Sequence, residues 1–188
     1  MTVNIQNLCK SFSSGLVLDH LNLHLDSSKC YCLMGPSGRG KTTLLRILMG
    51  LETADSGTVS GLEQSRIGVV FQEDRLCETF SPIDNVRLVT DLPADQVGTE
   101  LSRLLPKESL TRPVSTLSGG MKRRTAICRA LLAPCDILLM DEPFTGLDQQ
   151  TKAVTIQYLL EKAAGKLLLL STHQEEDAKL LGAEIIRL

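Results

Sequence analysis

The segment Gly35–Thr42 has a spacing of glycine, lysine and threonine that can bind phosphate groups. It fits the pattern G-x-x-x-x-G-K-[ST] at every fixed position. The apolar run Cys30–Met34 before it predicts a buried strand, and the residues after it predict a helix over 43–49. A glycine loop between a strand and a helix start directs backbone N–H groups and the helix dipole at an anion. The sequence therefore predicts a phosphate site in which Lys41 faces the β- and γ-phosphates and Thr42 offers a hydroxyl to Mg²⁺.

A pair of acids, Asp141 and Glu142, is a second feature that suits phosphate chemistry. The pair closes the apolar run Cys135–Asp141, which predicts a buried parallel strand. Successive strand residues point to opposite sides, so the two carboxylates are expected to have different tasks. One can hold Mg²⁺, and the other can orient or deprotonate an attacking water. The alternative interpretation is a solvated strand end without a chemical role.

A second glycine-rich helix start occurs at Ser118–Met121, ahead of an arginine-rich helix. It is a further potential anion site, although a serine N-cap alone would explain it. Two phosphate-facing segments are more than one nucleotide in one monomer needs. Taken alone, the segment is better explained as a capped helix start.

Composition gives no sign of a general attraction to nucleic acid. The 188 residues have a formal net charge of −2, and the local basic run Lys122–Arg124 is expected to form a charged helix face. The six cysteines contain no C-x-x-C pair and predict no Cys/His metal cluster, so we expect unpaired thiols. Unpaired thiols, together with the lack of an export signal or an apolar span, predict a cytoplasmic protein.

Alternating elements along the chain predict an α/β fold. Polar and apolar residues alternate over Leu21–Asp26, which indicates a half-buried antiparallel strand with Val3–Ile5 as its partner. Helical spacing with proline breaks predicts a small helical lobe at about residues 80–133. The remainder predicts a mostly parallel sheet covered on both faces. Further strands are expected at 56–59, 67–71, 135–141, 166–171 and 184–188, and helices at 117–133, 151–164 and 175–181.

Several motifs, in family order, resemble those of the ATP-binding subunits of ATP-binding cassette (ABC) transporters. Gly35–Thr42 is similar to the Walker A loop and Ile137–Glu142 to Walker B. Leu117–Gly120 is similar to the ABC signature, which separates this family from other P-loop proteins. The shorter motifs are the Q-loop at Phe71–Glu73, the D-loop at Gly146–Asp148 and the switch histidine at Thr172–His173.

The resemblance runs from about residue 3 to the end of the sequence and implies one ABC ATPase domain over residues 1–188. Such a domain has a P-loop NTPase core with a mostly parallel sheet, an N-terminal antiparallel β part and a helical subdomain, here at about 80–133. Its cofactors are ATP and Mg²⁺.

The resemblance also implies a role for each matching residue. Glu142 corresponds to the catalytic glutamate, and Gln72, Lys41 and His173 complete the catalytic set. Mg²⁺ would be held by Thr42, Gln72 and Asp141. The residues implied to contact ATP are Phe12 at the adenine, then Gly35, Pro36, Ser37, Gly38, Arg39, Gly40, Lys41, Thr42 and Thr43, with Ser118, Gly119 and Gly120 of the signature and Asp148 of the D-loop.

The family's activity is ATP hydrolysis that powers movement of a solute across a membrane. The resemblance implies an integral membrane permease as partner, and a second ATPase subunit, most simply an identical copy. Each ATP would lie between the Walker A loop of one chain and the signature of the other. The expected location is cytoplasmic, peripheral on the inner face of the cell membrane through the permease, with no nucleic-acid partner. The sequence names neither the solute nor the direction of transport.

Two departures and two alternatives remain open at this point. Met121 stands where the family commonly has glutamine, and the segment Gly61–Ile67 leaves little room for the usual antiparallel strands. A non-transport ABC ATPase acting on DNA or ribosomes is one alternative, although the chain lacks coiled coils and basic arms. A P-loop kinase is the other, and the signature and the Asp141–Glu142 pair argue against it.

Overall fold

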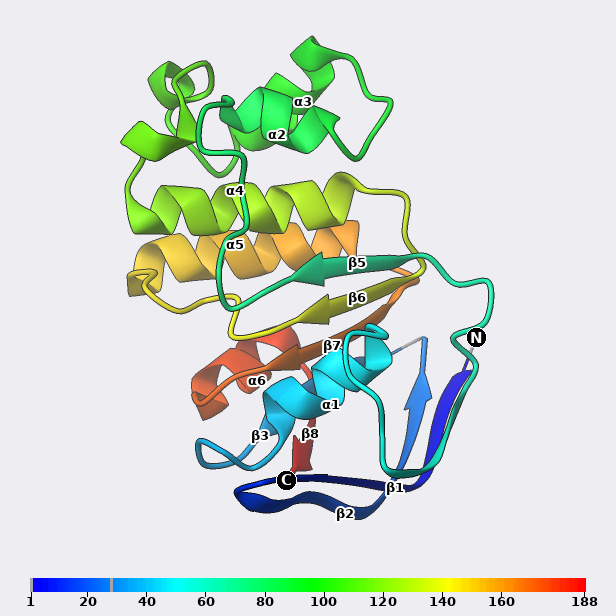
Figure 1. Cartoon of the computed structure of the whole chain (residues 1–188). Coiled ribbons are helices and arrows are strands. Elements are labelled where there is room, and N and C mark those ends of the chain that lie inside the picture. The colour runs from blue at the N-terminus through cyan, green and yellow to red at the C-terminus, as the bar shows by residue number, and fades with distance from the viewer. Residues whose placement is uncertain (1, 28) are drawn as a thin grey trace.

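A parallel five-stranded sheet forms the centre of the computed structural model, which describes residues 2–27 and 29–188 (Figure 1). Its strand order is β5-β6-β7-β3-β8, and each neighbouring pair is parallel. The middle strands are fully buried leucine-rich runs, as expected of a sheet covered on both faces. The bounds are β5 Ile67–Val70, β6 Ile137–Met140, β7 Leu167–Ser171, β3 Cys30–Met34 and β8 Glu184–Arg187. The predicted parallel sheet is confirmed, with strand ends that differ by a few residues.

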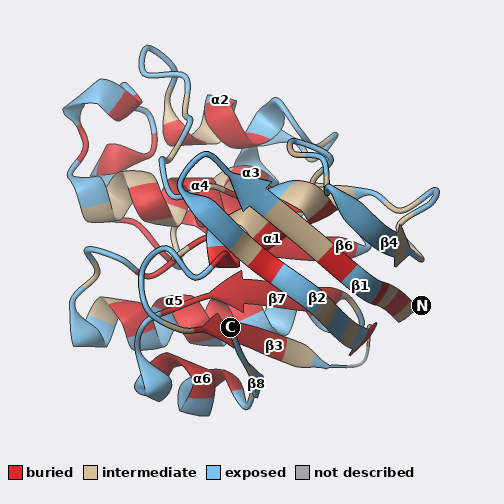
Figure 2. Ribbon diagram, turned by 60° about the horizontal axis from the view of Figure 1, so that its bottom comes forward, coloured by how far each residue is buried: buried red, intermediate tan, exposed pale blue. Residues whose placement is uncertain are grey.

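An antiparallel sheet of three strands packs beside it, in the order β2-β1-β4. Its strands are β1 Thr2–Phe12, β2 Gly15–Asp26 and β4 Ser56–Ser60. Val3 pairs with Leu25 and Ile5 with Leu23, so the predicted partner strands are confirmed. Buried and exposed bands alternate along β1 and β2 (Figure 2).

Two separate hydrophobic cores lie on the two faces of the parallel sheet. In β6, Leu138 and Met140 point into one core, and Ile137 and Leu139 into the other, as strand alternation requires. The first core is covered by α4 Gly119–Leu132, α5 Gln149–Lys162 and α6 Glu175–Leu181, and the second by α1 Lys41–Leu48 and the antiparallel sheet. Figure 1 shows α4 and α5 on one side and α1 on the other.

A helical lobe sits on the outer side of α4. It contains α2 Pro82–Arg87, α3 Ala94–Leu101 and the short 3₁₀ turns η1 Lys107–Ser109 and η2 Val114–Thr116. Its apolar residues Val86, Val97 and Leu101 belong to the same core as α4, so the lobe is packed against the sheet domain through that helix.

The entrance to this lobe is held by one fully buried asparagine. The Asn85 carboxamide accepts from the Cys77 N–H (2.8 Å) and donates to the carbonyls of Cys77 (3.1 Å) and Ser81 (3.0 Å). Its carbonyl and amide groups are thereby satisfied by the backbone, which fixes the turn between residues 77 and 81.

Replacing this asparagine should therefore destabilise the protein. Asn85→Ala removes the acceptor of the Cys77 N–H and leaves a cavity at a fully buried position, so we expect the free energy of unfolding in urea to fall by about 1–3 kcal/mol. Arg87→Ala, on the exposed side of the same helix, is the matched control and should change stability little. Equal midpoints for both variants would contradict the role assigned to Asn85.

Candidate nucleotide site

The loop between β3 and α1 encloses the side chain of Lys41. The ammonium group donates to the carbonyls of Gly35 (2.7 Å) and Pro36 (3.0 Å), and the residue is 6% exposed. Gly40, the N-cap of α1, has a φ of 88° and makes no side-chain cap, so the first N–H groups of the helix are open to an anion. A Cβ at Gly40 would lie 2.7 Å from Leu18 Cδ2 and 3.0 Å from the Val17 carbonyl oxygen, and the positive φ would strain any side chain there.

A hollow of about 390 Å³ opens in front of this loop and collects side chains from widely separated segments. Catalytic residues predicted from the motifs, Gln72, Glu142 and His173, face the same space as Lys41. The full lining is Phe12, Ser14, Val17, Ser37, Gly38, Gly40, Lys41, Thr42, Thr43, Gln72, Glu142 and His173. Gly35, Pro36 and Arg39 belong to the loop without lining the hollow.

Asp141 lies in an adjoining hollow, where Thr42 and Gln72 also appear. Its carboxylate is 4% exposed, and Oδ1 accepts a hydrogen bond of 2.6 Å from the Ser171 hydroxyl. The same hydroxyl oxygen accepts from the Glu142 N–H at 2.8 Å. Ser171 therefore fixes both acids from the neighbouring strand.

The two acids diverge because the backbone turns sharply at Glu142, whose φ is 47°. This turn aims the Glu142 carboxylate into the nucleotide hollow, where Oε1 lies 2.6 Å from His173 Nε2. The side chains of Glu142 and His173 are 21% and 41% exposed. Solvent therefore reaches Glu142 and His173. The different surroundings of Asp141 and Glu142 agree with the expectation that the two acids have different tasks.

A buried polar network supports the loop that carries His173. The Thr172 hydroxyl donates to Asp177 Oδ2 at 2.6 Å, and Lys152 Nζ donates to Asp177 Oδ1 at 2.8 Å and to Gln174 Oε1 at 2.5 Å. Lys152 and Asp177 are 8% and 2% exposed, so each charge is stabilised by the other. Through Lys152, helix α5 holds the histidine loop in place.

The basic run in α4 does not form the charged helix face that the sequence predicted. Arg123 is only 8% exposed, and its guanidinium donates to the carbonyls of Phe71 (2.7 Å) and Gln72. Arg123 Nε also lies 3.2 Å from Asp74 Oδ1. Burial raises the pKa of Asp74, and the charge of Arg123 opposes that rise. Arg123 is buried rather than surface-exposed because its guanidinium turns inward to the carbonyls of the segment that follows β5.

The signature residues lie outside the hollow of their own chain. Ser118 is the exposed N-cap of α4, and its hydroxyl accepts from the Met121 N–H at 3.3 Å. Asp148 is the exposed N-cap of α5, and hydrogen bonds from Thr151 lower the pKa of its carboxyl. Ser118, Gly119, Gly120 and Asp148 are absent from the lining of the hollow. Within one chain, the structure therefore does not bring these four residues to the P-loop.

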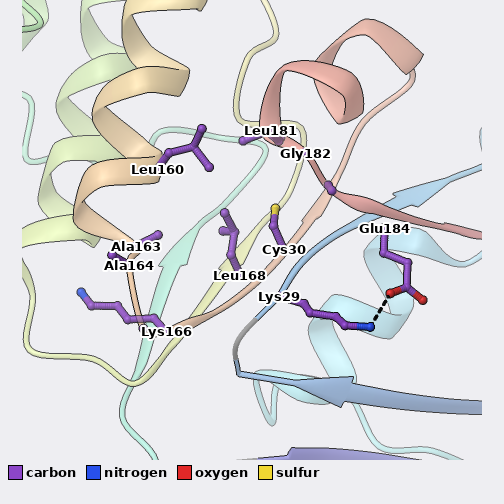
Figure 3. A pocket seen from close by; sticks show the side chains of 12 residues that line it. Lys29, Cys30, Leu160, Ala163, Ala164, Lys166, Leu168, Leu181, Gly182 and Glu184 are labelled. Atoms are coloured by element: carbon purple, nitrogen blue, oxygen red, sulfur yellow. Dashed lines mark hydrogen bonds and ion pairs between the residues drawn. The ribbon is translucent and has the colours of Figure 1, made fainter.

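A larger hollow of about 570 Å³ lies at the opposite end of the sheet (Figure 3). Cys30, at the start of β3, and Leu168, near the start of β7, line it, together with the ion pair Lys29–Glu184 at 3.0 Å. The P-loop follows the other end of β3, so this hollow is separate from the candidate nucleotide site.

Comparison with known proteins decides the family. Residues 18–145 match the family described as "ABC transporter". The chain belongs to the ABC transporter family. This confirms the resemblance drawn from the motifs and, with the fold described above, the predicted ABC ATPase fold class.

Curated ABC proteins match the chain closely in sequence. Nod factor export ATP-binding protein I of Cupriavidus metallidurans is 38% identical, over 95% of this chain and 65% of the relative. Sulfate/thiosulfate import ATP-binding protein CysA of Neisseria meningitidis serogroup A is 35% identical, over 99% of this chain and 58% of the relative. The chain thus spans less than two thirds of the length of these relatives.

A solved ABC cassette matches the fold. The dimeric structure of MJ0796, titled a bacterial ABC transporter cassette, superposes with a TM-score of 0.87 and 26% identity, covering 99% of this chain and 94% of that chain. A second structure of MJ0796, titled a post-hydrolysis state bound to ADP and Pi, gives a TM-score of 0.84. Among residues 2–27 and 29–188, no helix has the length and apolar character needed to cross a bilayer.

Sequence reasoning missed two side chains that support the site. Ser171 is the one polar residue in the strand Leu167–Ser171, and a hydroxyl at the carboxyl end of a leucine run was a usable signal. Arg123 gave no such signal, because Lys122 and Arg124 beside it are equally basic.

Loss of Arg123 should loosen the Q-loop. Arg123→Met removes two charge-assisted hydrogen bonds that tie the carbonyls of Phe71 and Gln72 to α4, so amide exchange over residues 71–75 should accelerate about tenfold. Lys122→Met, which breaks only the exposed pair with Glu78, is the matched control. Unchanged hydrogen exchange in this segment of the Arg123 variant would show that the guanidinium does not hold the loop.

Proposed function

We propose that this chain binds ATP with Mg²⁺ and hydrolyses it, powering movement of a solute through a separate integral membrane permease. The observation that supports this most strongly is the hollow shared by Lys41, Thr42, Gln72, Glu142 and His173. In this proposal residues 1–188 act as one ABC ATPase domain with a helical subdomain at about 80–133. The domain works at the cytoplasmic face of the cell membrane.

The triphosphate would occupy the front of the P-loop. Backbone N–H groups at the start of α1 would hold its oxygens, and Lys41 would exchange its two carbonyl partners for the β- and γ-phosphates. Phe12, 43% exposed at the end of β1, offers a ring face to the adenine. The bonds from Lys41 to the phosphates would be stronger than its present bonds to the carbonyls, which favours the ATP-bound state.

The donor set beside the P-loop suits Mg²⁺. Thr42, Gln72 and Asp141 line one hollow and offer a hydroxyl, an amide oxygen and a carboxylate, which are the hard oxygen ligands that Mg²⁺ prefers. The ion would neutralise phosphate charge as the terminal bond breaks. Ser171 holds the Asp141 carboxylate in a fixed orientation for this role.

Glu142 is the proposed general base. Its carboxylate would accept a proton from the water that attacks the γ-phosphorus, and His173 Nε2, now 2.6 Å from Oε1, would hold the carboxylate or a phosphate oxygen. Gln72 would help to orient the water. Buried partners behind both acids and behind the histidine loop limit the freedom of these groups before the reaction.

A second chain would complete each site. Ser118, Gly119, Gly120 and Asp148 are exposed or half-exposed at helix starts and outside the hollow of their own chain, so they are free to meet ATP bound to another copy. The permease would dock on the helical lobe, where Phe80, Leu88 and Val89 are 43%, 56% and 39% exposed. Large apolar side chains exposed on so small a lobe favour a protein partner.

The role of Glu142 can be tested by one substitution. Glu142→Gln keeps the shape and removes the basic charge, so ATP hydrolysis should fall by about 10²–10⁴-fold while ATP binding persists. Bound ATP should then hold a dimer in size-exclusion chromatography with Mg²⁺. Glu175→Gln, at an exposed ion pair with Arg187, should hydrolyse normally. Near-normal turnover by Glu142→Gln would remove this residue from catalysis, and phosphate transfer to an acceptor by the wild type would instead support a kinase.

Mixing two inactive variants tests the shared site. Lys41→Ala and Ser118→Arg should each inactivate a homodimer, because every site then contains one defect. Their heterodimer has one site with both lesions and one intact site, so partial ATPase activity should return with a concentration dependence set by dimerisation. A confirmed heterodimer without any recovery would contradict the two-chain site.

A further inference from the structure

The side chains of Cys9, Asp19 and His20 form a group that the nucleotide chemistry does not use. One ligand atom from each, the thiol sulfur, a carboxylate oxygen and a ring nitrogen, all lie within 4.8 Å of one another. We propose that this group is a binding site for Zn²⁺. The proposal departs from the expectation that the cysteines form no metal cluster, because these ligands come from two paired strands rather than from one local motif.

A bulge in the antiparallel sheet brings these ligands together. Between the pairs Leu8–Leu21 and Lys10–Leu18, β1 advances by fewer residues than β2, so Asp19 and His20 both lie opposite Cys9. In a regular strand two successive side chains point to opposite faces. Here the φ of His20 is 43°, a conformation rarely adopted by residues other than glycine, and it lets both side chains approach the sulfur.

The donor set selects the class of metal. Thiolate sulfur with imidazole nitrogen and a carboxylate oxygen suits Zn²⁺, whereas Mg²⁺ favours oxygen donors alone. Zinc ligands lie about 2.0–2.3 Å from the ion and therefore about 3.5 Å from one another. The sulfur must approach the other two ligands, and Asp19 Oδ1 and His20 Nδ1, now hydrogen-bonded at 2.7 Å, must separate to admit the ion. Asp19 and His20 are exposed, so their side chains can move at little cost, and a water would take the fourth position.

One backbone N–H already donates to the sulfur. The His20 N–H donates to Cys9 Sγ at 3.3 Å, and the Cys9 thiol donates to the Asn7 carbonyl at 3.6 Å. Asn22 holds the bulge by donating to the His20 carbonyl at 2.7 Å and accepting from the Asn7 N–H at 2.9 Å. Metal binding would replace the thiol proton, which leaves to solvent, while the N–H bond to sulfur is kept.

Cobalt and zinc titrations of the nucleotide-free protein test the site. One equivalent of Co²⁺ per chain should bind with a thiolate-to-metal charge-transfer absorption, and Zn²⁺ should displace it. Cys9→Ser should abolish this absorption, and His20→Gln should weaken metal binding by about tenfold or more. Cys77→Ser and His24→Gln, at exposed positions outside the group, are the matched controls and should bind like the wild type.

Alkylation of the unmodified protein gives a second measurement that does not depend on the folding of any variant. Zn²⁺ should slow the reaction of Cys9 with iodoacetamide about tenfold or more and leave Cys77 unchanged. The proposal is overturned if the charge-transfer band is missing, if it persists in Cys9→Ser, or if Zn²⁺ leaves the alkylation of Cys9 unchanged.

Discussion

The parallel hydrogen bonding of β5, β6, β7 and β3 is the constraint on which the candidate nucleotide site depends. Because these strands run in the same direction and lie side by side, the segments after them emerge at one edge of the sheet. Gln72 follows β5, Asp141 and Glu142 follow β6, and His173 follows β7. The P-loop follows β3. Pairing of the strands is therefore enough to bring together residues that lie more than a hundred positions apart in the sequence.

Buried polar groups then set the orientation of what the sheet has brought together. Ser171 connects the two acids of β6, and the Lys152–Asp177 pair connects α5 to the loop of His173. An unpaired charge at either buried position would be costly, so each partner requires the other. Because α5 begins directly after Asp148, Lys152 joins the first turn of this helix to the loop that carries the histidine.

Local sequence patterns were sufficient to predict much of the fold. They failed for side chains whose positions depend on tertiary contacts. The P-loop, the leucine-rich strands and the helix Glu175–Leu181 follow from spacing and burial that a short window contains. Arg123 was wrongly expected on a charged surface, because the carbonyls that accept its hydrogen bonds lie about fifty residues away in the sequence. Cys9 and His20 meet only through a strand bulge, which alternation of polar and apolar residues does not reveal.

At Glu142 the positive φ opposes two requirements, the stability of the fold and the carboxylate that the proposed catalysis needs. Glycine or asparagine adopts such a backbone angle at a lower cost than glutamate, by an amount of order 1 kcal/mol or more. Laboratory evolution for thermal stability would therefore favour replacing Glu142 by glycine or asparagine. A variant selected only by its melting temperature would then lack the proposed base. If Glu142 is the base, selection for turnover retains a glutamate at a position where stability alone favours glycine or asparagine.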